Sequence, residues 1–306
     1  MKKIRLSTTF CKVRFSTPLV TPSGIVVAPK EIIKLAKLKG IGGVTTKSYS
    51  ILSREGHPLP HIASYKVGFI NAVGLKNPGI KKAKKEIVHL KKVIKKPIIA
   101  SIFTAQLSEF AFLAREIAKT KPDFIELNLS CPHVDDEFGR PLACDPMLTA
   151  MAILEVKKVV KNIPIIAKLT PNTPELKRVA FEVEKAGADA ICAINTVGPG
   201  LLIDIKNKRP ILGHGIGGVS GPAIKPIALR CVNDIYKTVK IPIIGVGGIS
   251  SGKDAIEMIM AGASLVGIGS AIYKQGYEVF NKIIKEIEMI SKKEKINSLK
   301  KIRGII

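Results

Sequence analysis

Tryptophan is absent from the 306-residue sequence, and tyrosine and cysteine occur only five times each. The cysteines are widely spaced and form no Cys-x-x-Cys pair, so neither a disulfide framework nor a zinc or iron–sulfur motif is indicated. No run reaches the ~18 uninterrupted apolar residues of a membrane span. Residues 1–15 contain lysines but no apolar core or small-residue cleavage site, unlike a secretory signal. These absences predict a reducing, cytoplasmic location and no insertion into a membrane.

Arginine is also scarce, although the chain is strongly basic. Lysine and arginine total 49 against 24 acidic residues, a net charge of +25, and only 9 of the 49 are arginine. Such a charge is typical of nucleic-acid-binding proteins. Arginine, however, is the residue that reads bases and binds phosphates bidentately, and the lysines here are dispersed over expected helix faces such as 81–85. We therefore interpret the charge as a solvated surface and expect no nucleic-acid partner.

Short apolar segments alternate with helical segments along the chain, as in α/β proteins with a parallel sheet. Pro97-Ile-Ile-Ala, Pro164-Ile-Ile-Ala and Pro242-Ile-Ile-Gly each follow a lysine-rich segment and open a strand, which indicates repeated βα units. Strands are expected at 19–21, 43–46, 98–102, 124–129, 165–169, 190–194, 243–246 and 265–268. Helices are expected at 29–39, 79–95, 106–120, 146–161, 174–186, 222–239, 253–261 and 271–291.

Eight βα units in about 250–300 residues predict a single (β/α)8 TIM barrel. An open doubly wound sheet is the alternative, but it would need one switch point and usually has fewer strands. No linker divides residues 1–306, so one domain is expected. Insertions at 47–77, 132–145 and 197–220 follow the second, fourth and sixth strands. All three leave the carboxyl ends of strands, where barrel active sites lie, and we expect them to be functional.

Polar side chains gather where the expected strands end. The strand that begins at Phe124 must stop before Pro132, which cannot donate a ladder hydrogen bond and restricts the residue before it. Cys131 lies at this exit, and a lone cysteine is more often a buried apolar residue than a catalyst. The other strand ends change that interpretation, because they present further polar residues and glycines, namely Ser23, Lys47, Ser48, Lys168, Asn195, Thr196, Gly247, Gly248, Gly269 and Ser270.

Glycines and lysines at these strand ends indicate a ligand that carries phosphate. Gly247-Gly248 and Gly269-Ser270 follow the seventh and eighth strands, the phosphate-binding positions of a barrel. Glycine lets backbone N–H groups approach a phosphate closely, and a helix dipole favours its charge. Lys47 and Lys168 each interrupt an apolar strand end, and a buried lysine is costly unless paired or functional. Either alone could be a snorkelling surface lysine, but together they predict a cationic pocket for an electron-rich ring or an anion.

Amide side chains favour a flat heterocyclic ligand. Asn71, Asn128 and Asn195, with Thr196, supply both donors and acceptors, which suits an amide-rich ring better than a sugar or acyl chain. No metal is expected, because the cysteines and histidine of segment 131–144 offer only three ligands without standard zinc spacing. A dinucleotide-binding motif is also absent, since the glycines of 213–218 lack the strand–turn–helix context and the acid downstream.

Taken together, these motifs resemble the class 1 dihydroorotate dehydrogenases over residues 15–290. The resemblance is carried by segments 46–60, 71–79, 128–132, 168–172, 195–196, 217–221, 247–249 and 269–270. It implies an FMN-containing TIM barrel that oxidises dihydroorotate to orotate in pyrimidine synthesis.

The resemblance also implies residue roles. Cys131 would be the general base that takes the C5 proton while C6 delivers hydride to the flavin; Lys47 and Lys168 complete the catalytic set, and Lys168 would stabilise charge on the reduced flavin. FMN would be held by Ser23, Lys47, Ser48, Ser101, Asn128, Lys168, Gly221, Gly247, Gly248, Gly269 and Ser270. Dihydroorotate or orotate would be held by Lys47, Asn71, Gly74, Leu75, Asn128, Asn195 and Thr196.

Two positions depart from the family pattern. Ser101 stands where the family usually has asparagine, and His133 stands where asparagine often follows Cys-Pro. Both, with residues 217–229, also resemble the pyrimidine-reducing module of dihydropyrimidine dehydrogenase, which is the alternative function. That module lacks the 74–79 loop, and its larger relatives carry cysteine clusters that this chain lacks, so dihydroorotate is the expected substrate.

Subgroups of the family differ in their electron acceptor. Residues 1–15 are too short and too charged for the amphipathic segment of the membrane-quinone subgroup. The NAD-linked subgroup, which this chain resembles somewhat better than the fumarate-using one, transfers electrons to a second subunit that carries FAD and a [2Fe–2S] cluster. We therefore expect a homodimer of this chain with an iron–sulfur flavoprotein on each copy.

Overall fold

Eight parallel strands form the centre of the computed structural model, which describes residues 4–129 and 142–306. Their order in the sheet is β3-β16-β15-β10-β9-β8-β7-β4, and a parallel bridge between Val20 and Gly43 joins the two ends into a barrel. The strands are β3 (Leu19–Val20), β4 (Val44–Thr45), β7 (Ile98–Ile102), β8 (Phe124–Asn128), β9 (Ile165–Leu169), β10 (Ala190–Ala193), β15 (Ile243–Val246) and β16 (Leu265–Gly267). Each matches an expected strand to within one residue at either end, so the predicted TIM barrel is confirmed.

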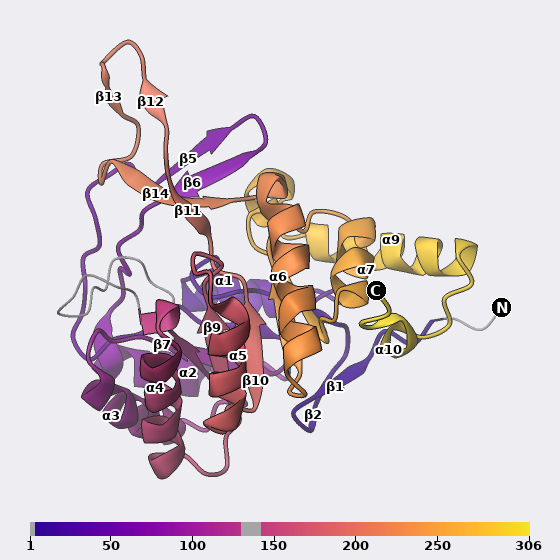
Figure 1. Ribbon diagram of the computed structural model, residues 1–306, viewed down its shortest axis with the longest axis horizontal. Helices are drawn as coiled ribbons and strands as arrows, with labels where there is room; N and C mark the ends of the chain where they lie inside the picture. Colours follow the sequence, from indigo (N-terminus) through magenta and orange to yellow (C-terminus); the bar gives the residue numbers. More distant parts are fainter. Residues whose placement is uncertain (1–3, 130–141) are drawn as a thin grey trace.

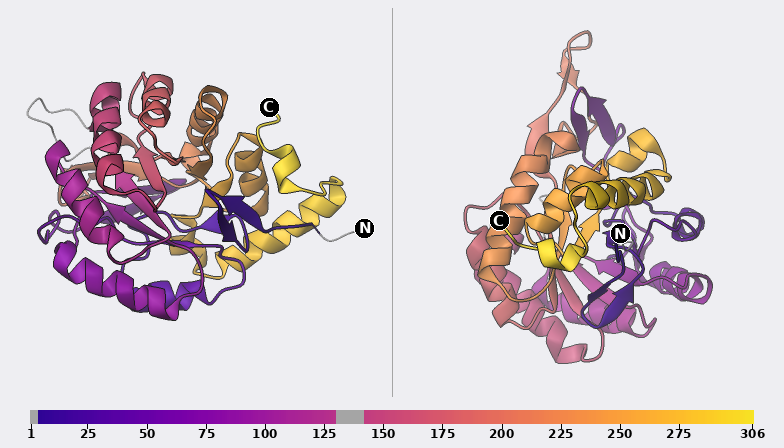
Figure 2. Two further views of the ribbon diagram at one scale, coloured as in Figure 1. Left: turned by 90° about the horizontal axis from the view of Figure 1, so that it is seen from below. Right: turned by 90° about the vertical axis from the view of Figure 1, so that its right-hand side faces the viewer.

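Helices cover the outside of the barrel (Figure 2) because parallel strands are apolar on both faces and need a layer over each. They are α1 (Pro29–Ala36), α2 (Gly79–Val93), α3 (Leu107–Ala118), α4 (Pro146–Val159), α5 (Leu176–Lys185), α6 (Lys225–Thr238), α7 (Gly252–Met260), α8 (Ala271–Gln275), α9 (Val279–Lys293) and α10 (Leu299–Ile302), with short 3-10 turns η1 (Leu142–Cys144) and η2 (Pro222–Ile224). The single helix expected at 271–291 is wrong. Gly276 adopts a left-handed φ of 65°, which ends α8 before α9 begins.

An amino-terminal hairpin, which the sequence analysis did not predict, covers the amino-terminal end of the barrel. Its strands are β1 (Thr8–Phe10) and β2 (Val13–Phe15). The rings of Phe10 and Phe15 lie 5.7 and 5.9 Å from the ring of Phe124, centroid to centroid, at the start of β8. This aromatic cluster fills the amino-terminal end of the barrel, so the carboxyl-terminal end is the one left open for a site.

Two of the insertions form one antiparallel sheet, here called the hood sheet, ordered β11-β14-β6-β5. Its strands are β5 (Ile62–Tyr65), β6 (Gly68–Asn71), β11 (Val197–Leu201) and β14 (Ile216–Ser220), and the pair β12 (Ile203–Asp204) and β13 (Arg209–Pro210) extends beyond it (Figure 1). The sequence analysis predicted functional insertions here but no strands. The insertion at 132–145 lies outside the described residues except for its end, which contains η1.

No helix within residues 4–129 and 142–306 is both long and apolar enough to cross a membrane.

Candidate active site

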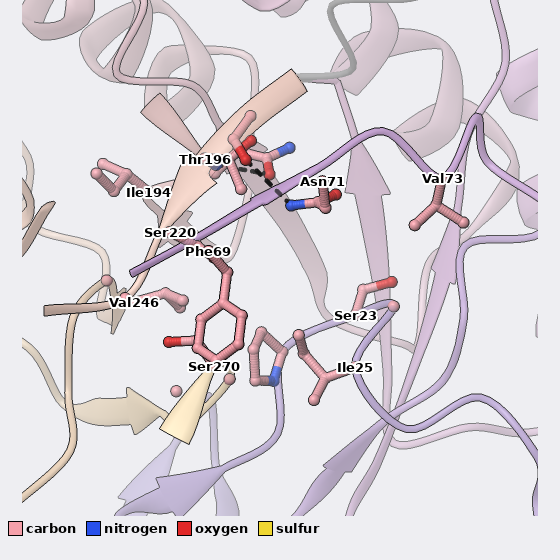
Figure 3. A pocket seen from close by; sticks show the side chains of 18 of the residues that line it. Ser23, Ile25, Phe69, Asn71, Val73, Ile194, Thr196, Ser220, Val246 and Ser270 are labelled. Atoms are coloured by element: carbon pink, nitrogen blue, oxygen red, sulfur yellow. Dashed lines mark hydrogen bonds between the residues drawn. The ribbon is translucent and has the colours of Figure 1, made fainter. Parts of the chain in front are cut away.

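A pocket lies between the carboxyl ends of the barrel strands and the hood sheet (Figure 3). Of the seventeen site residues named from the sequence, fifteen line it: Ser23, Lys47, Ser48, Asn71, Gly74, Leu75, Asn128, Lys168, Asn195, Thr196, Gly221, Gly247, Gly248, Gly269 and Ser270. Ser101 is not part of the lining and lies fully buried behind Ser48. The proposed base, Cys131, falls outside the described residues.

A chain of hydroxyls forms one wall of the pocket and continues into the barrel. Ser23 Oγ lies 2.9 Å from Ser48 Oγ, which lies 2.9 Å from Ser101 Oγ. Ser101 Oγ donates to Glu126 Oε1 over 2.8 Å, and Asn128 Nδ2 donates to Ser48 Oγ over 3.1 Å. The side chains of β7 and β8 therefore hold in place two residues that face the pocket.

Two lysines give the pocket positive charge. Lys168 is only 6% exposed and lies on β9 between Asn128 of β8 and Cys192 of β10. Burial, and next the charge of Lys76, lower the pKa of Lys47. In the described part of the chain, no carboxylate lies within 4.0 Å of either ammonium group. Two partly desolvated cations without a close anion favour a ligand that carries or develops negative charge.

Amides from the hood sheet and the barrel form the roof of the pocket. Asn71 Nδ2 on β6 donates to the carbonyl of Gly218 on β14 over 3.3 Å. Asn195 Oδ1 accepts a hydrogen bond from Thr196 N over 2.8 Å, just before β11. Figure 3 shows Asn71 and Thr196 side by side over the pocket. These contacts bring one amide from the insertion at 47–77 and one from the segment after β10 over the barrel, where they can bind the polar edge of a flat ring.

Glycines form a cradle on the opposite side of the pocket. Gly221, Gly247 and Gly248 have φ angles of 95°, 135° and 74°, which side-chain-bearing residues rarely adopt. A Cβ at Gly248 would lie 2.6 Å from Lys225 Cβ, so only glycine fits there. With the backbone of Gly269 beside them, these positions can present N–H groups to a phosphate. The donor set, the cations and the cradle together fit a phosphorylated flavin such as FMN.

Contacts between the two insertions hold the hood sheet together above the site. The imidazoles of His57 and His214 stack with centroids 3.7 Å apart, and the main-chain N–H of Gly213 donates to Pro60 O over 3.1 Å. Phe69 of β6 contacts Tyr273 of α8, with ring centroids 5.8 Å apart, and so ties the hood to the barrel. Both aromatic residues line the pocket and were not named from the sequence.

Glu126 is the most informative residue that the sequence analysis passed over. It is 1% exposed in the middle of β8, where its neighbours are apolar. A carboxylate inside an otherwise apolar strand is a usable signal, since a buried charge requires partners. Among the described residues, no group of three or more histidine, cysteine or acidic side chains could hold a metal ion.

The chain matches known proteins over nearly its whole length. Residues 5–290 match the family model for dihydroorotate dehydrogenase. The chain is 40% identical to the catalytic subunit of dihydroorotate dehydrogenase B (NAD(+)) from Methanothermobacter thermautotrophicus, over 98% of both chains. It is 43% identical to the same-named subunit from Pyrococcus abyssi, over 96% of both chains. The crystal structure of ligand-free DHODH from Eimeria tenella superimposes with a TM-score of 0.85 and 20% identity, covering 98% of this chain and 91% of that one.

The family expected from the motifs is thus confirmed, and the structural comparison supports the same fold. The chain belongs to the dihydroorotate dehydrogenase family, whose members are oxidoreductases of pyrimidine biosynthesis.

Proposed function

We propose that this chain is the FMN-dependent catalytic subunit of an NAD-linked dihydroorotate dehydrogenase, and that residues 1–306 act as one cytoplasmic domain. The observation that supports this most strongly is the convergence of fifteen sequence-named residues on one pocket. They come from seven barrel strand ends, from the insertion at 47–77, and from Gly221, which directly follows the insertion at 197–220. The barrel brings any strand ends together, so the support comes from the types of residue gathered there: lysines, amides, hydroxyls and positive-φ glycines.

The glycine cradle would hold the FMN phosphate, with Gly221, Gly247, Gly248 and Gly269 supplying close backbone N–H groups. Bound FMN would supply the hydride acceptor of the reaction. Lys168, buried beside Asn128, would stabilise negative charge at the ring system through a short-range field in a low-dielectric site.

The substrate would lie under the hood sheet. Lys47 would attract the carboxylate of dihydroorotate, and the amides of Asn71 and Asn195 would bind polar groups of its ring. Closure by the hood would exclude water from the reacting atoms. Cys131 would act as a thiolate base and remove the C5 proton while the C6 hydrogen leaves as hydride, which gives orotate.

Electrons would leave the chain through a partner. Its relatives are named catalytic subunits of the NAD(+) enzyme, and the sequence of this chain contains no dinucleotide-binding motif or cysteine cluster. We propose a homodimer that binds a second subunit with FAD and a [2Fe–2S] cluster.

Purification provides the first test. The protein should be yellow and release FMN, not FAD, on denaturation. With dihydroorotate as electron donor, the isolated chain should reduce an artificial dye. Without a partner subunit it should not reduce NAD. Colourless protein that cannot be reconstituted with FMN would contradict the cofactor proposal. Robust NAD reduction by the isolated chain would contradict the proposal of a partner subunit. Reduction of fumarate would place the chain in the fumarate-using subgroup.

A further inference from the structure

Three hydroxyls and one carboxylate form a continuous hydrogen-bonded chain from the barrel interior to the pocket: Glu126, Ser101, Ser48 and Ser23. The inner three side chains are at most 5% exposed, so bulk water does not compete for these bonds. Ser48 Oγ has three neighbours, because Asn128 Nδ2 also donates to it. The question is which way each hydroxyl proton points.

Glu126 is the acceptor at the inner end of this chain. Ser101 Oγ donates to Glu126 Oε1 over 2.8 Å. Burial, and next the charge of Glu126, raise the pKa of the Cys192 thiol well above its usual value, so the thiol stays protonated and can donate. The Lys168 ammonium also acts on Cys192 and so adds positive charge to this layer of the barrel.

The hydrogen bond that Ser101 donates to Glu126 determines the direction of every other bond in the chain. A hydroxyl has one proton and two lone pairs. Ser101 gives its proton to Glu126, so Ser101 Oγ must accept from Ser48. Ser48 has then used its proton, and it must accept from both of its other neighbours, Ser23 Oγ and Asn128 Nδ2. One donated and two accepted bonds satisfy Ser48 completely.

We propose that Glu126 is a positioning residue: through Ser101 and Ser48, its carboxylate makes this wall of the pocket a hydrogen-bond acceptor. Ser23 has given its proton to Ser48, so its oxygen offers lone pairs to the pocket. The amide of Asn128 is held with its nitrogen towards Ser48 and its carbonyl oxygen turned away. Such a wall selects ligands that present N–H groups to it and disfavours those that present only acceptors.

This inference deepens the proposed function and rests on it, because FMN, dihydroorotate and orotate all carry ring N–H groups. It adds a basis for ligand specificity, the direction of the hydrogen bonds, that does not depend on the shape of the cavity. A reversed chain would turn the Ser23 hydroxyl and the Asn128 amide into donors towards the same ligand edge. Ring N–H groups would then face protein N–H or O–H groups.

Neutron diffraction from crystals of the perdeuterated wild-type protein, with the flavin that it retains, tests the direction of the bonds. We expect the Ser101 deuteron on the line to Glu126, the Ser48 deuteron towards Ser101, and the Ser23 deuteron towards Ser48. A deuteron on Glu126, or a Ser48 deuteron directed at Ser23 or Asn128, would overturn the proposal. This reading does not depend on turnover, so it stands apart from the proposed function.

A binding experiment tests the consequence. Ser101→Ala releases the Ser48 proton; Thr120→Ala removes another buried hydroxyl, which bonds to Ile117 O far from the pocket. Binding of orotate and of its N1- and N3-methyl derivatives is followed by the change in the flavin spectrum. We expect Ser101→Ala to weaken orotate binding by about 3- to 10-fold, the scale of one hydrogen bond. The ratio between the dissociation constants of one methyl derivative and of orotate should become smaller in this variant.

The control Thr120→Ala should leave both quantities unchanged. An unchanged preference in a folded Ser101→Ala protein that retains flavin would contradict the proposal. Failure of the wild type to bind flavin or orotate at all would instead contradict the proposed function, while the neutron result would still decide the direction of the chain.

Discussion

Gly248→Ala tests the glycine cradle directly. Gly248 has a φ of 74°, and an alanine Cβ there would lie 2.6 Å from Lys225 Cβ and 2.8 Å from Lys225 Cα and N. Lys225 begins α6, and its ammonium group lies 2.6 Å from Asp254 Oδ1 and 2.7 Å from Glu257 Oε2. The backbone that meets the new methyl group is therefore held in place and cannot move away without loss of these contacts.

A matched control separates the steric effect from the backbone effect. Gly276 has a similar φ of 65°, but an added Cβ there meets nothing within 4 Å. A positive-φ conformation such as that of Gly276, with ψ of −174°, costs alanine about 1–3 kcal/mol, and the smaller entropy of the unfolded chain offsets about 0.4–1 kcal/mol. Gly276→Ala should therefore destabilise the protein by about 1 kcal/mol. Overpacking at Gly248 adds about 1–3 kcal/mol, which gives about 2–4 kcal/mol in total.

Urea unfolding and flavin content provide the assay. Gly248→Ala should lower the free energy of unfolding by about 1–3 kcal/mol more than Gly276→Ala. It should also lose FMN during purification, because the displaced backbone no longer fits a phosphate. Equal stabilities for the two variants, with full FMN in both, would refute the cradle as the structure describes it.

Three further predictions concern the base, the cation and the core. Cys131→Ser should slow flavin reduction by about 10²-fold with FMN content unchanged, and near-normal reduction would exclude Cys131 as the base. Burial lowers the pKa of Lys47 below its ordinary value of 10.5, so the affinity for orotate should fall as the pH rises through this lowered pKa. Arginine keeps its charge to higher pH, so in spectral titrations of Lys47→Arg the loss of affinity should occur at higher pH. Phe124→Ala should lower the free energy of unfolding in urea by about 3–5 kcal/mol, whereas the same change at the half-exposed Phe181 should lower it by about 0.5 kcal/mol or less. Equal losses of stability would contradict the packing of the hairpin against Phe124.

The barrel could be predicted because its strands are local signals. Segments such as Ile98–Ile102 and Ile165–Leu169 are short apolar runs between lysine-rich helices, and burial on both faces requires such a composition. The lining of the pocket followed from the rule that barrel sites lie at the carboxyl ends of strands. Lys168 was found in this way, as a cation at the end of an apolar run.

The parts that were missed depend on contacts distant in sequence or on unusual turns. The hairpin turn at Cys11 and Lys12 has positive φ at both residues without the usual asparagine or glycine, so it gave no turn signal. The hood strands are short, and β14 contains glycines that argue against a strand until β6 pairs with them. Gly276, by contrast, was a visible signal for a helix end that the sequence analysis did not use.

Anaerobic mixing of the purified flavoprotein with substrate tests the central claim most directly. If the pocket is built for dihydroorotate, that compound should bleach the flavin absorbance rapidly, and dihydrouracil, which lacks the carboxylate for Lys47, should bleach it far more slowly. Rapid bleaching by dihydrouracil with no response to dihydroorotate would contradict the account and establish a dihydropyrimidine dehydrogenase.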